Sequence, residues 1–248
     1  MSPQGRESSR KPPTGKRHFT TLDALSASLV ECRACPRLVA HREAVATKKR
    51  RRYVAETYWG RPVPGFGDPR APLVIVGLAP GAHGANRTGR VFTGDRSGEF
   101  LYAALHRAGL SNQATSEHRG DGLSLRGVYV TLAVRCVPPE NRPAPDEIER
   151  CGVAWLDREL ALLSPRVVLA LGSIAWNAWL DHRARSGVAI PRPRPKFAHG
   201  ACVRLADGPL LLGSYHVSQQ NTQTGRLTPA MFDRILRRAR AEAEPGRF

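Results

Sequence analysis

The stretch that decides the fold reads LVIVGLAPGAHGANRTGRVFTGDRSG and spans residues 73–98. Its first four residues are apolar and largely β-branched, which is typical of a short buried strand. A glycine-rich loop follows, and glycine lets the backbone approach a ligand closely and expose consecutive N–H groups. The loop ends where a helix is predicted to begin, and the amino end of a helix favours anions. It contains neither a Walker lysine pattern nor a G-x-G-x-x-G fingerprint, which argues against a nucleotide cofactor.

Signals for strands and helices alternate along the rest of the chain. Strands are predicted at residues 73–76, 128–134, 167–171, 201–205 and 210–214. Helices are predicted at residues 20–31, 97–108, 145–163 and 174–182 and after Thr228, and an irregular loop at residues 58–72. This alternation predicts an α/β fold with a mostly parallel sheet covered on both faces. Ligands bind such sheets at the carboxyl ends of strands, which points to the loops after residues 76, 134 and 214.

The chain is strongly basic. Its 248 residues include 38 Lys and Arg against 21 Asp and Glu, which gives a formal net charge of +17. Such a field attracts polyanions, and nucleic acid is favoured as the partner over an anionic membrane surface. Residues 1–19 are predicted to form a disordered basic arm, and a second basic run, KKRRR, occupies residues 48–52. The length suits one sizeable core, so residues 20–248 are predicted to form a single domain.

The sequence carries no sign of a membrane or secreted protein. No apolar run approaches the roughly 20 residues that a membrane span needs. The first 19 residues lack the apolar centre of a secretory signal. We therefore expect a cytoplasmic, DNA-associated monomer without a membrane partner. In that compartment, five cysteines favour metal binding or redox chemistry over a disulfide framework.

Four of the cysteines are spaced as metal ligands. Cys32 and Cys35 form a C-x2-C pair in an arginine-rich neighbourhood, and Cys136 and Cys151 form a wider second pair. Four thiolates suit either tetrahedral zinc or an iron–sulfur cluster, and the spacing alone does not choose between them. Four protein ligands leave no open coordination position, so the site is predicted to be structural. Cys202, in contrast, is predicted to be a small buried residue within a strand.

Three side chains in the predicted loops are candidates for chemistry, each with a structural alternative. Phe92 is either a stacking platform for a planar base or a plug in the core. Asp95 either caps the following helix or orients a water molecule. His216 opens a polar loop at the end of the last strand, where a functional role is more frequent than for an isolated histidine.

Two longer motifs resemble a known family. GLAPGAHGANRTGRVFTGDRSG at residues 77–98 and HVSQQNTQTGRLT at residues 216–228, together with the four cysteines, resemble the type B (family 5) uracil-DNA glycosylases of bacteria and archaea. The resemblance implies a three-layer α/β/α sandwich around a mainly parallel four-stranded sheet. It implies a [4Fe-4S] cluster on Cys32, Cys35, Cys136 and Cys151. It also implies hydrolysis of the N-glycosidic bond of uracil and other deaminated bases, such as hypoxanthine, in single- or double-stranded DNA, which initiates base excision repair.

The resemblance further implies how a base would be held and removed. A nucleotide flipped out of DNA would stack its base on Phe92, beneath the backbone of Gly77-Leu78-Ala79. Asp95 would stabilise the developing sugar cation or position the attacking water. His216 would donate a hydrogen bond to the departing base, and Asn141 would be a further polar contact.

The same resemblance implies contacts with the DNA strand. Ser218, Asn221 and Thr224 would hold backbone phosphates, while Arg226 and Leu227 would enter the duplex near the lesion. These residues lie in one polar segment after the last predicted strand.

The sequence departs from better-known uracil glycosylases at three positions. Their polar residue after the first glycine of the motif is replaced by Leu78 and Ala79, which cannot activate water. The asparagine with which many relatives read uracil is replaced by Leu132. Type B enzymes share such losses, so a broad specificity set by the shape of the pocket is expected.

Two other interpretations remain open. A zinc-stapled DNA-binding module without catalysis would explain the charge and the cysteines but not the two polar motifs. An iron–sulfur electron carrier would explain the cysteines but not the charge.

Overall fold

The computed structural model describes residues 19–206 and 208–244. Apart from Phe19, the predicted basic arm lies outside these described residues. No helix in the described ranges is both long and apolar enough to cross a membrane.

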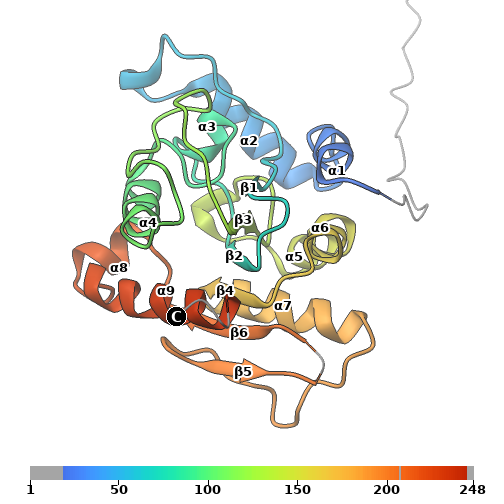
Figure 1. Cartoon of the computed structure of the whole chain (residues 1–248). Helices are drawn as coiled ribbons and strands as arrows, with labels where there is room; N and C mark the ends of the chain where they lie inside the picture. Colours follow the sequence, from blue (N-terminus) through green and yellow to red (C-terminus); the bar gives the residue numbers. More distant parts are fainter. Residues whose placement is uncertain (1–18, 207, 245–248) are drawn as a thin grey trace, which may run out of the picture.

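A six-stranded sheet in the order β1-β3-β2-β4-β6-β5 forms the centre of the fold (Figure 1). The strands are β1 Phe66–Gly67, β2 Leu73–Gly77, β3 Val128–Leu132, β4 Val167–Leu171, β5 Cys202–Arg204 and β6 Leu210–Ser214. The four inner strands are parallel, and every residue in them is buried, as expected for strands covered on both faces. The predicted mainly parallel α/β sheet is therefore confirmed.

The predicted number of four strands is wrong for the whole sheet, because two short antiparallel strands extend its edges. β5 has three residues and pairs with β6, while β1 has two residues and pairs with β3. β1 lies in the segment for which the sequence predicts an irregular loop. Two half-buried residues carry no periodicity of their own, and only the pairing with β3 makes them a strand.

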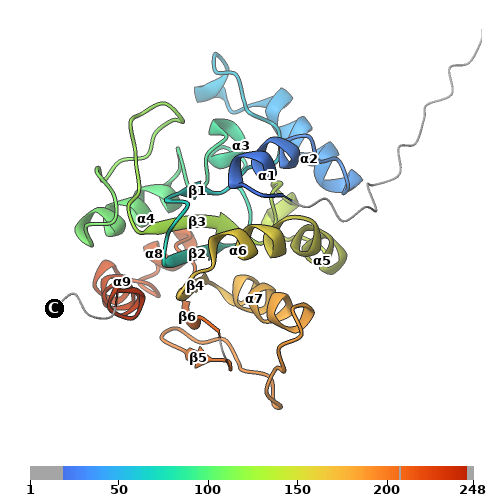
Figure 2. The same cartoon turned by 45° about the vertical axis from the view of Figure 1, so that its right-hand side comes forward.

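Helices cover both faces of the sheet (Figure 2). α4 (Arg96–Arg107) and α9 (Pro229–Ala243) pack on one face, and α6 (Asp157–Leu163) and α7 (Ser173–Arg185) pack on the other. α1 (Leu22–Leu29) lies against α6. The other α-helices of the described residues are α2 Pro36–Lys48, α3 Ala85–Thr88, α5 Pro145–Cys151 and α8 Gln219–Gln223, and short 3-10 helices span Arg51–Tyr53 and Pro139–Asn141. The three-layer α/β/α sandwich is thus confirmed.

The helix predicted at residues 145–163 contains a distortion. A π-helical turn, Gly152–Leu156, separates α5 from α6. Single π turns inside α-helices often mark functional positions. This turn begins immediately after Cys151, the last candidate metal ligand.

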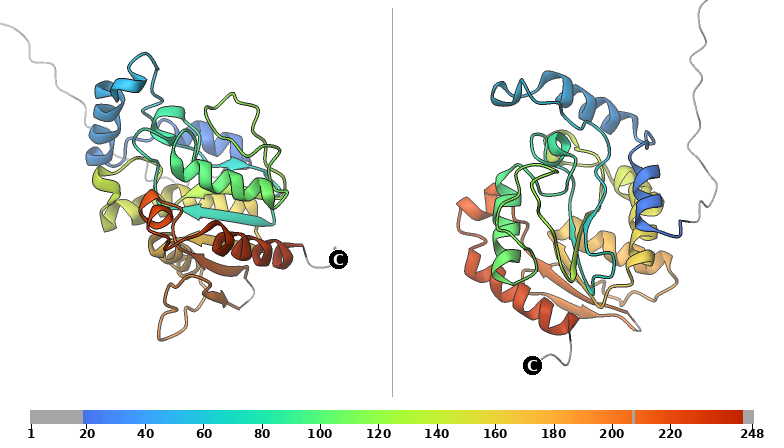
Figure 3. Two further views of the ribbon diagram at one scale, coloured as in Figure 1. Left: turned by 90° about the vertical axis from the view of Figure 1, so that its left-hand side faces the viewer. Right: turned by 45° about the horizontal axis from the view of Figure 1, so that its top comes forward.

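The parallel strands end together at one edge of the sheet. Gly77 is the register partner of Leu132, and Leu171 is the register partner of Ser214. The arrow of β2 points toward the side of the molecule where α2, α5 and α8 lie (Figure 3, left). The loops after β2, β3 and β6 therefore meet there, as the sequence predicts.

Cys202 does not match its prediction. The sequence predicts that it is buried, but its side chain is exposed on β5. β5 is the outermost strand of the sheet, and Cys202 and Arg204 are exposed while Val203 between them is half-buried. The local sequence pattern does not reveal which of these side chains faces solvent.

Candidate functional site

A cleft of about 890 Å³ opens where the three loops meet. Most of the non-cysteine site residues predicted from the sequence line it: Leu78, Ala79, Phe92, Asp95, Asn141, His216, Ser218 and Asn221. Gly77, Thr224, Arg226 and Leu227 do not. The two polar motifs, which lie far apart in the chain, thus form one concave surface.

Phe92 lies on the floor of the cleft, against the end of β2. Its side chain is buried, and its ring centroid is 6.1 Å from that of His216. A Cβ atom on Gly77 would come within 2.6 Å of the Phe92 ring, so glycine is required for this close approach. Phe92 therefore fills the edge of the core, as one of the two sequence-based alternatives predicts. Its ring also lines the cleft, where the other alternative, stacking on a base, stays a prediction.

Asp95 is the amino-terminal cap of α4. Its Oδ1 atom accepts a hydrogen bond from the Gly98 N–H at 3.0 Å. Its Oδ2 atom faces Gly81 and Gly84, where added Cβ atoms would come within 2.6 Å and 1.9 Å of it. One carboxylate oxygen thus fixes the orientation of the side chain, and glycine leaves room for the other. Burial raises the pKa of Asp95 above its ordinary value.

His216 begins the polar loop after β6. Burial lowers its pKa to about 4, so the imidazole is neutral near pH 7. Among the residues that the structure describes, its ring nitrogens have no hydrogen-bond partner. The backbone carbonyl of His216 accepts a hydrogen bond from the Asn221 side chain at 2.8 Å. Asn221 therefore holds the His216 loop in place through its amide nitrogen.

Asn141 lies on the opposite rim, in a short turn after β3. Its side chain is exposed, and both Asn141 and the preceding Glu140 have positive φ angles, 56° and 52°. Asparagine tolerates this conformation better than most residues do. The turn brings Glu140, Asn141 and Arg142 to the cleft together.

The sequence did not predict a third part of the rim. Arg50, Arg52 and Tyr53 line the cleft and follow α2 directly. The KKRRR run is expected to bind DNA, but nothing in its sequence indicates that two of its arginines line the same cleft as the glycine-rich loop. The segment after α2 contacts the glycine-rich loop through residues distant in sequence, because the Tyr58 hydroxyl lies 3.0 Å from His83 Nδ1.

One residue of the last motif, Leu227, does not lie as predicted. Leu227 is fully buried in the core and cannot enter a duplex without leaving it. The Arg226 guanidinium lies over the Tyr215 ring, 4.6 Å from its centroid. The polar neighbours of Leu227 suggest that its side chain is exposed, but the side chain packs in the core and holds the segment there.

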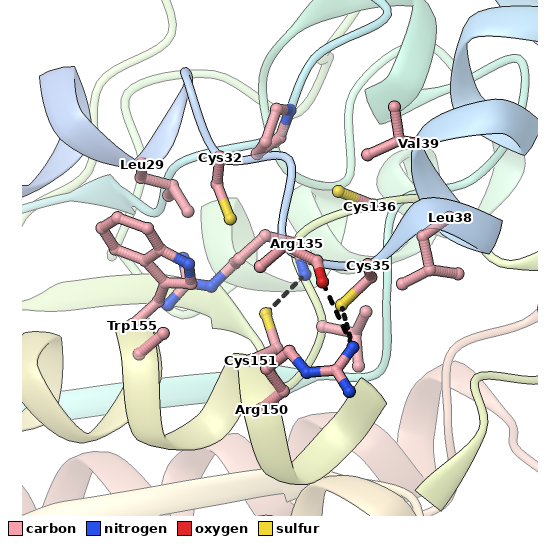
Figure 4. Close-up of a pocket in the computed structure, with 14 residues that line it drawn as sticks. Leu29, Cys32, Cys35, Leu38, Val39, Arg135, Cys136, Arg150, Cys151 and Trp155 are labelled. Atoms are coloured by element: carbon pink, nitrogen blue, oxygen red, sulfur yellow. Dashed lines mark hydrogen bonds between the residues drawn. The ribbon is translucent and has the colours of Figure 1, made fainter. Parts of the chain in front are cut away.

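The four candidate metal ligands surround one small cavity between α2, α5 and the loop after β3. The sulfur atoms of Cys32, Cys35, Cys136 and Cys151 are all directed toward this space (Figure 4). None of the four forms a disulfide. Among the described residues, no three His, Cys, Asp or Glu side chains are gathered tightly enough for one metal ion.

Cationic and backbone donors point at three of these sulfur atoms. Arg42, a buried side chain, donates to Cys136 Sγ at 3.0 Å. The backbone N–H of Arg135 donates to Cys151 Sγ at 3.4 Å, and Arg150 donates to Cys35 Sγ at 3.7 Å. Burial raises the pKa of the Cys136 thiol to about 11. A bound metal would deprotonate such thiols, and the three donors suit the negative sulfur that results.

Comparison with known proteins identifies the family of the chain. The model of the uracil DNA glycosylase superfamily matches residues 64–240, which include both polar motifs and the last two candidate ligands. The chain belongs to this superfamily.

Individual relatives place it more narrowly. It is 53% identical over 218 residues to a type-5 uracil-DNA glycosylase of Mycobacterium tuberculosis, across 87% of this chain and 80% of the relative. It is 54% identical over 219 residues to the type-5 enzyme of Thermus thermophilus, across 88% and 96% of the two chains. A type-4 uracil-DNA glycosylase of Pyrobaculum aerophilum is 37% identical over 124 residues, or 50% of this chain and 55% of the relative. The resemblance to type-5 members of the superfamily is therefore confirmed.

Proposed function

We propose that this superfamily member is a DNA glycosylase that hydrolyses the N-glycosidic bond of uracil and other deaminated bases, including hypoxanthine. Residues 20–248 would act as one catalytic domain on DNA and start base excision repair. The observation that carries the proposal is the arrangement of Asp95, Phe92 and His216 around one cleft. The type-5 relatives are uracil-DNA glycosylases, which supports the same activity here.

The floor of the cleft suits a flipped base. The Phe92 ring offers a flat apolar surface, and stacking on an aromatic ring contributes about 1–3 kcal/mol per base. Flipping itself costs a few kcal/mol, and least for a mispaired base, so it adds selectivity. Leu78, Ala79 and Leu132 supply apolar walls without side-chain donors. A pocket of this kind would accept several deaminated bases by shape, which is the basis for including hypoxanthine.

His216 would assist departure of the base. Cleavage of the N-glycosidic bond leaves negative charge on the base and positive charge on the sugar. A neutral imidazole has one N–H to donate, and that donor would stabilise the charge as it develops on a base oxygen. The absence of a hydrogen-bond partner for the ring among the described residues leaves this donor available.

Asp95 would act on the sugar side. Its capping bond to Gly98 holds Oδ1, so Oδ2 can stabilise the sugar cation or accept a proton from the attacking water. Asn141, across the cleft, would provide a further polar contact to the base or to water. Arg50, Arg52 and Ser218 on the rim would bind phosphates on both sides of the flipped nucleotide.

The cysteine site would hold a [4Fe-4S] cluster that stabilises the fold and takes no part in bond cleavage. A single zinc ion requires four sulfur atoms within about 2.3 Å of one point. The four thiols line one cavity, which suits a group held by all four, and the family resemblance favours the cluster over zinc. Hydrogen bonds to cluster sulfur atoms are a common feature of such sites, and Arg42 and Arg135 supply them here. A brown protein that contains iron would support the cluster, and a colourless zinc protein would contradict it.

The activity is tested with oligonucleotides that carry one uracil or one hypoxanthine. The wild-type protein should convert them to abasic strands that alkali cleaves, and an undamaged duplex should stay intact. A DNA-binding module without catalysis would bind all three and cleave none. Intact uracil and hypoxanthine strands after prolonged incubation would refute the proposed function.

A further inference from the structure

Arg87 lies inside the glycine-rich loop and binds several segments at once. Its side chain is 8% exposed. Nε donates to the His83 carbonyl at 2.8 Å, and Nη2 donates to the Gly94 carbonyl at 3.0 Å. Nη1 pairs with Glu56 at 2.5 Å, and the guanidinium lies over the Tyr53 ring, 4.0 Å from its centroid. One planar side chain thus joins both arms of the loop to the segment after α2.

The hydrogen bond to Gly94 affects the residue that follows it, Asp95. The Gly94 carbonyl is held by Arg87, and the Gly94 N–H donates to the Ser116 carbonyl at 2.8 Å. The φ angle of Gly94 is +78°, and a Cβ atom there would come within 2.3 Å of Arg87 Nη2. The guanidinium therefore occupies the space beside Gly94 and fixes the direction in which the backbone enters Asp95.

Arg87 has no place in the wall of the cleft, which distinguishes it from the neighbouring arginines. Arg50, Arg52 and Arg96 line the cleft, whereas Arg87 lies behind the residues that form its surface. Its donors are used by protein acceptors: two carbonyls and one carboxylate. Three of its five N–H donors are thus bonded to protein acceptors and the side chain does not line the cleft, so we expect Arg87 to affect the reaction through its neighbours.

We propose that Arg87 is a positioning residue that holds Gly94, and through it the Asp95 carboxylate, at the cleft. Tyr53 and Glu56 hold Arg87 in turn, so the placement of Asp95 depends on the same segment whose Arg50 and Arg52 lie on the rim. The inference rests on the proposed function, because it concerns how the catalytic carboxylate is placed.

A double-mutant cycle tests this role. Arg87→Lys keeps the charge but cannot reach both carbonyls and Glu56, because an ammonium lacks the planar fork. Since small misplacements of a reacting group can cost 10²-fold, the single-turnover rate on uracil DNA should fall by about 10- to 100-fold. The dissociation constant for abasic DNA should change by less than about threefold, because Arg87 does not line the cleft. In an Asp95→Asn background the same substitution should slow the reaction by less than about twofold.

Arg107→Lys is the matched control. Arg107 lies at the other end of α4, where it forms an exposed ion pair with Asp233. This control should keep the wild-type rate in the wild-type background and leave the rate of Asp95→Asn unchanged.

The outcomes separate the inference from the function on which it rests. Equal slowing by Arg87→Lys in both backgrounds, or an unchanged rate, would overturn the positioning role. If the wild-type protein excises no uracil, the proposed function itself is overturned. If Arg87→Lys does not fold, as judged by its melting temperature, Glu56→Gln replaces it and should show the same non-additive pattern at smaller amplitude.

Discussion

The two carboxylate oxygens of Asp95 lie in different surroundings, and the contribution of each can be tested separately. Oδ1 caps α4, whereas Oδ2 faces the cleft from a position where burial raises the pKa of the group. Asparagine caps a helix as well as aspartate does, but it carries no charge. Under the proposed function, the stability of the helix would therefore depend on the capping bond of this side chain, and the chemistry of the cleft on its charge.

Two substitutions of Asp95 should differ in stability while sharing the loss of activity. Asp95→Asn should retain the melting temperature of the wild type and lose about 10²-fold or more of the excision rate. Asp95→Ala should lose the activity as well and lower the unfolding free energy by about 0.5–2 kcal/mol, because the cap is removed. Denaturant unfolding and single-turnover kinetics on the same preparations check both. Full activity of Asp95→Asn would exclude a charged role for this residue.

His216 makes the stability of the protein depend on pH. Its pKa falls from 6.5 to about 4 on folding, so the folded state binds fewer protons than the unfolded state between these values. Its contribution is present above pH 6.5 and is lost as the pH falls toward 4. Between pH 7 and pH 5 the wild type should lose about 2 kcal/mol more than His216→Asn, which does not titrate. Unfolding curves at the two pH values measure the difference, and parallel losses in both proteins would contradict the lowered pKa.

At the scale of elements, the segment after α2 forms one wall of the cleft. Arg50 and Arg52 line it, whereas Lys48 and Arg51, from the same basic run, do not. The sequence gives no reason to distinguish the five charges of this run. The structure separates those that line the cleft from those that do not.

The salt dependence of DNA binding should reveal these two classes. Every phosphate that the protein no longer neutralises lowers the slope of log affinity against log salt by about 0.9. Arg50→Gln together with Arg52→Gln should therefore flatten the slope by about 1.8, whereas Lys48→Gln with Arg51→Gln should leave it nearly unchanged. Titrations of duplex DNA at several salt concentrations test this. Equal slopes for the two double variants would mean that the basic run acts only as a diffuse charge.

Local sequence predicts the helices and strands better than it predicts the tertiary contacts between them. The four parallel strands are visible as mainly apolar runs, and the cap at Thr228 is visible because a threonine precedes Pro229. The structure agrees, since the Thr228 hydroxyl accepts a hydrogen bond from the Met231 N–H. β1 escapes sequence reasoning because two residues form a strand only by pairing with β3. The role of Arg87 cannot be predicted because its partners lie in separate segments. Leu227 is wrongly predicted to be exposed because its sequence neighbours are polar, although the side chain is buried. Contacts between distant segments leave no periodic signal in a single sequence.

For the whole molecule, the cysteine site joins the amino-terminal helices to the sheet. Cys32 and Cys35 flank the turn between α1 and α2, Cys136 follows β3, and Cys151 ends α5. Around them the apolar side chains form a small separate cluster, including Leu25, Leu29, Leu38 and Trp155. A core of that size gives limited stability, so the docking of α1 and α2 should depend on the group that the thiols hold.

Cys136→Ser tests this dependence, with Cys202→Ser as the control because Cys202 is exposed on β5. Cys136→Ser should lose the visible absorbance and the bound iron and lower the melting temperature, while the control keeps all three. Hydrogen exchange should quicken in α1 and α2 but not in β2 or β4, which lie in a different part of the core. Because α2 leads directly into the segment that carries Arg50 and Arg52, DNA affinity should weaken more than the single-turnover rate. Unchanged exchange in α2 after loss of the metal would show that this helix docks without the cysteine site, and the rim would then owe its position to Tyr58 and Arg87 alone.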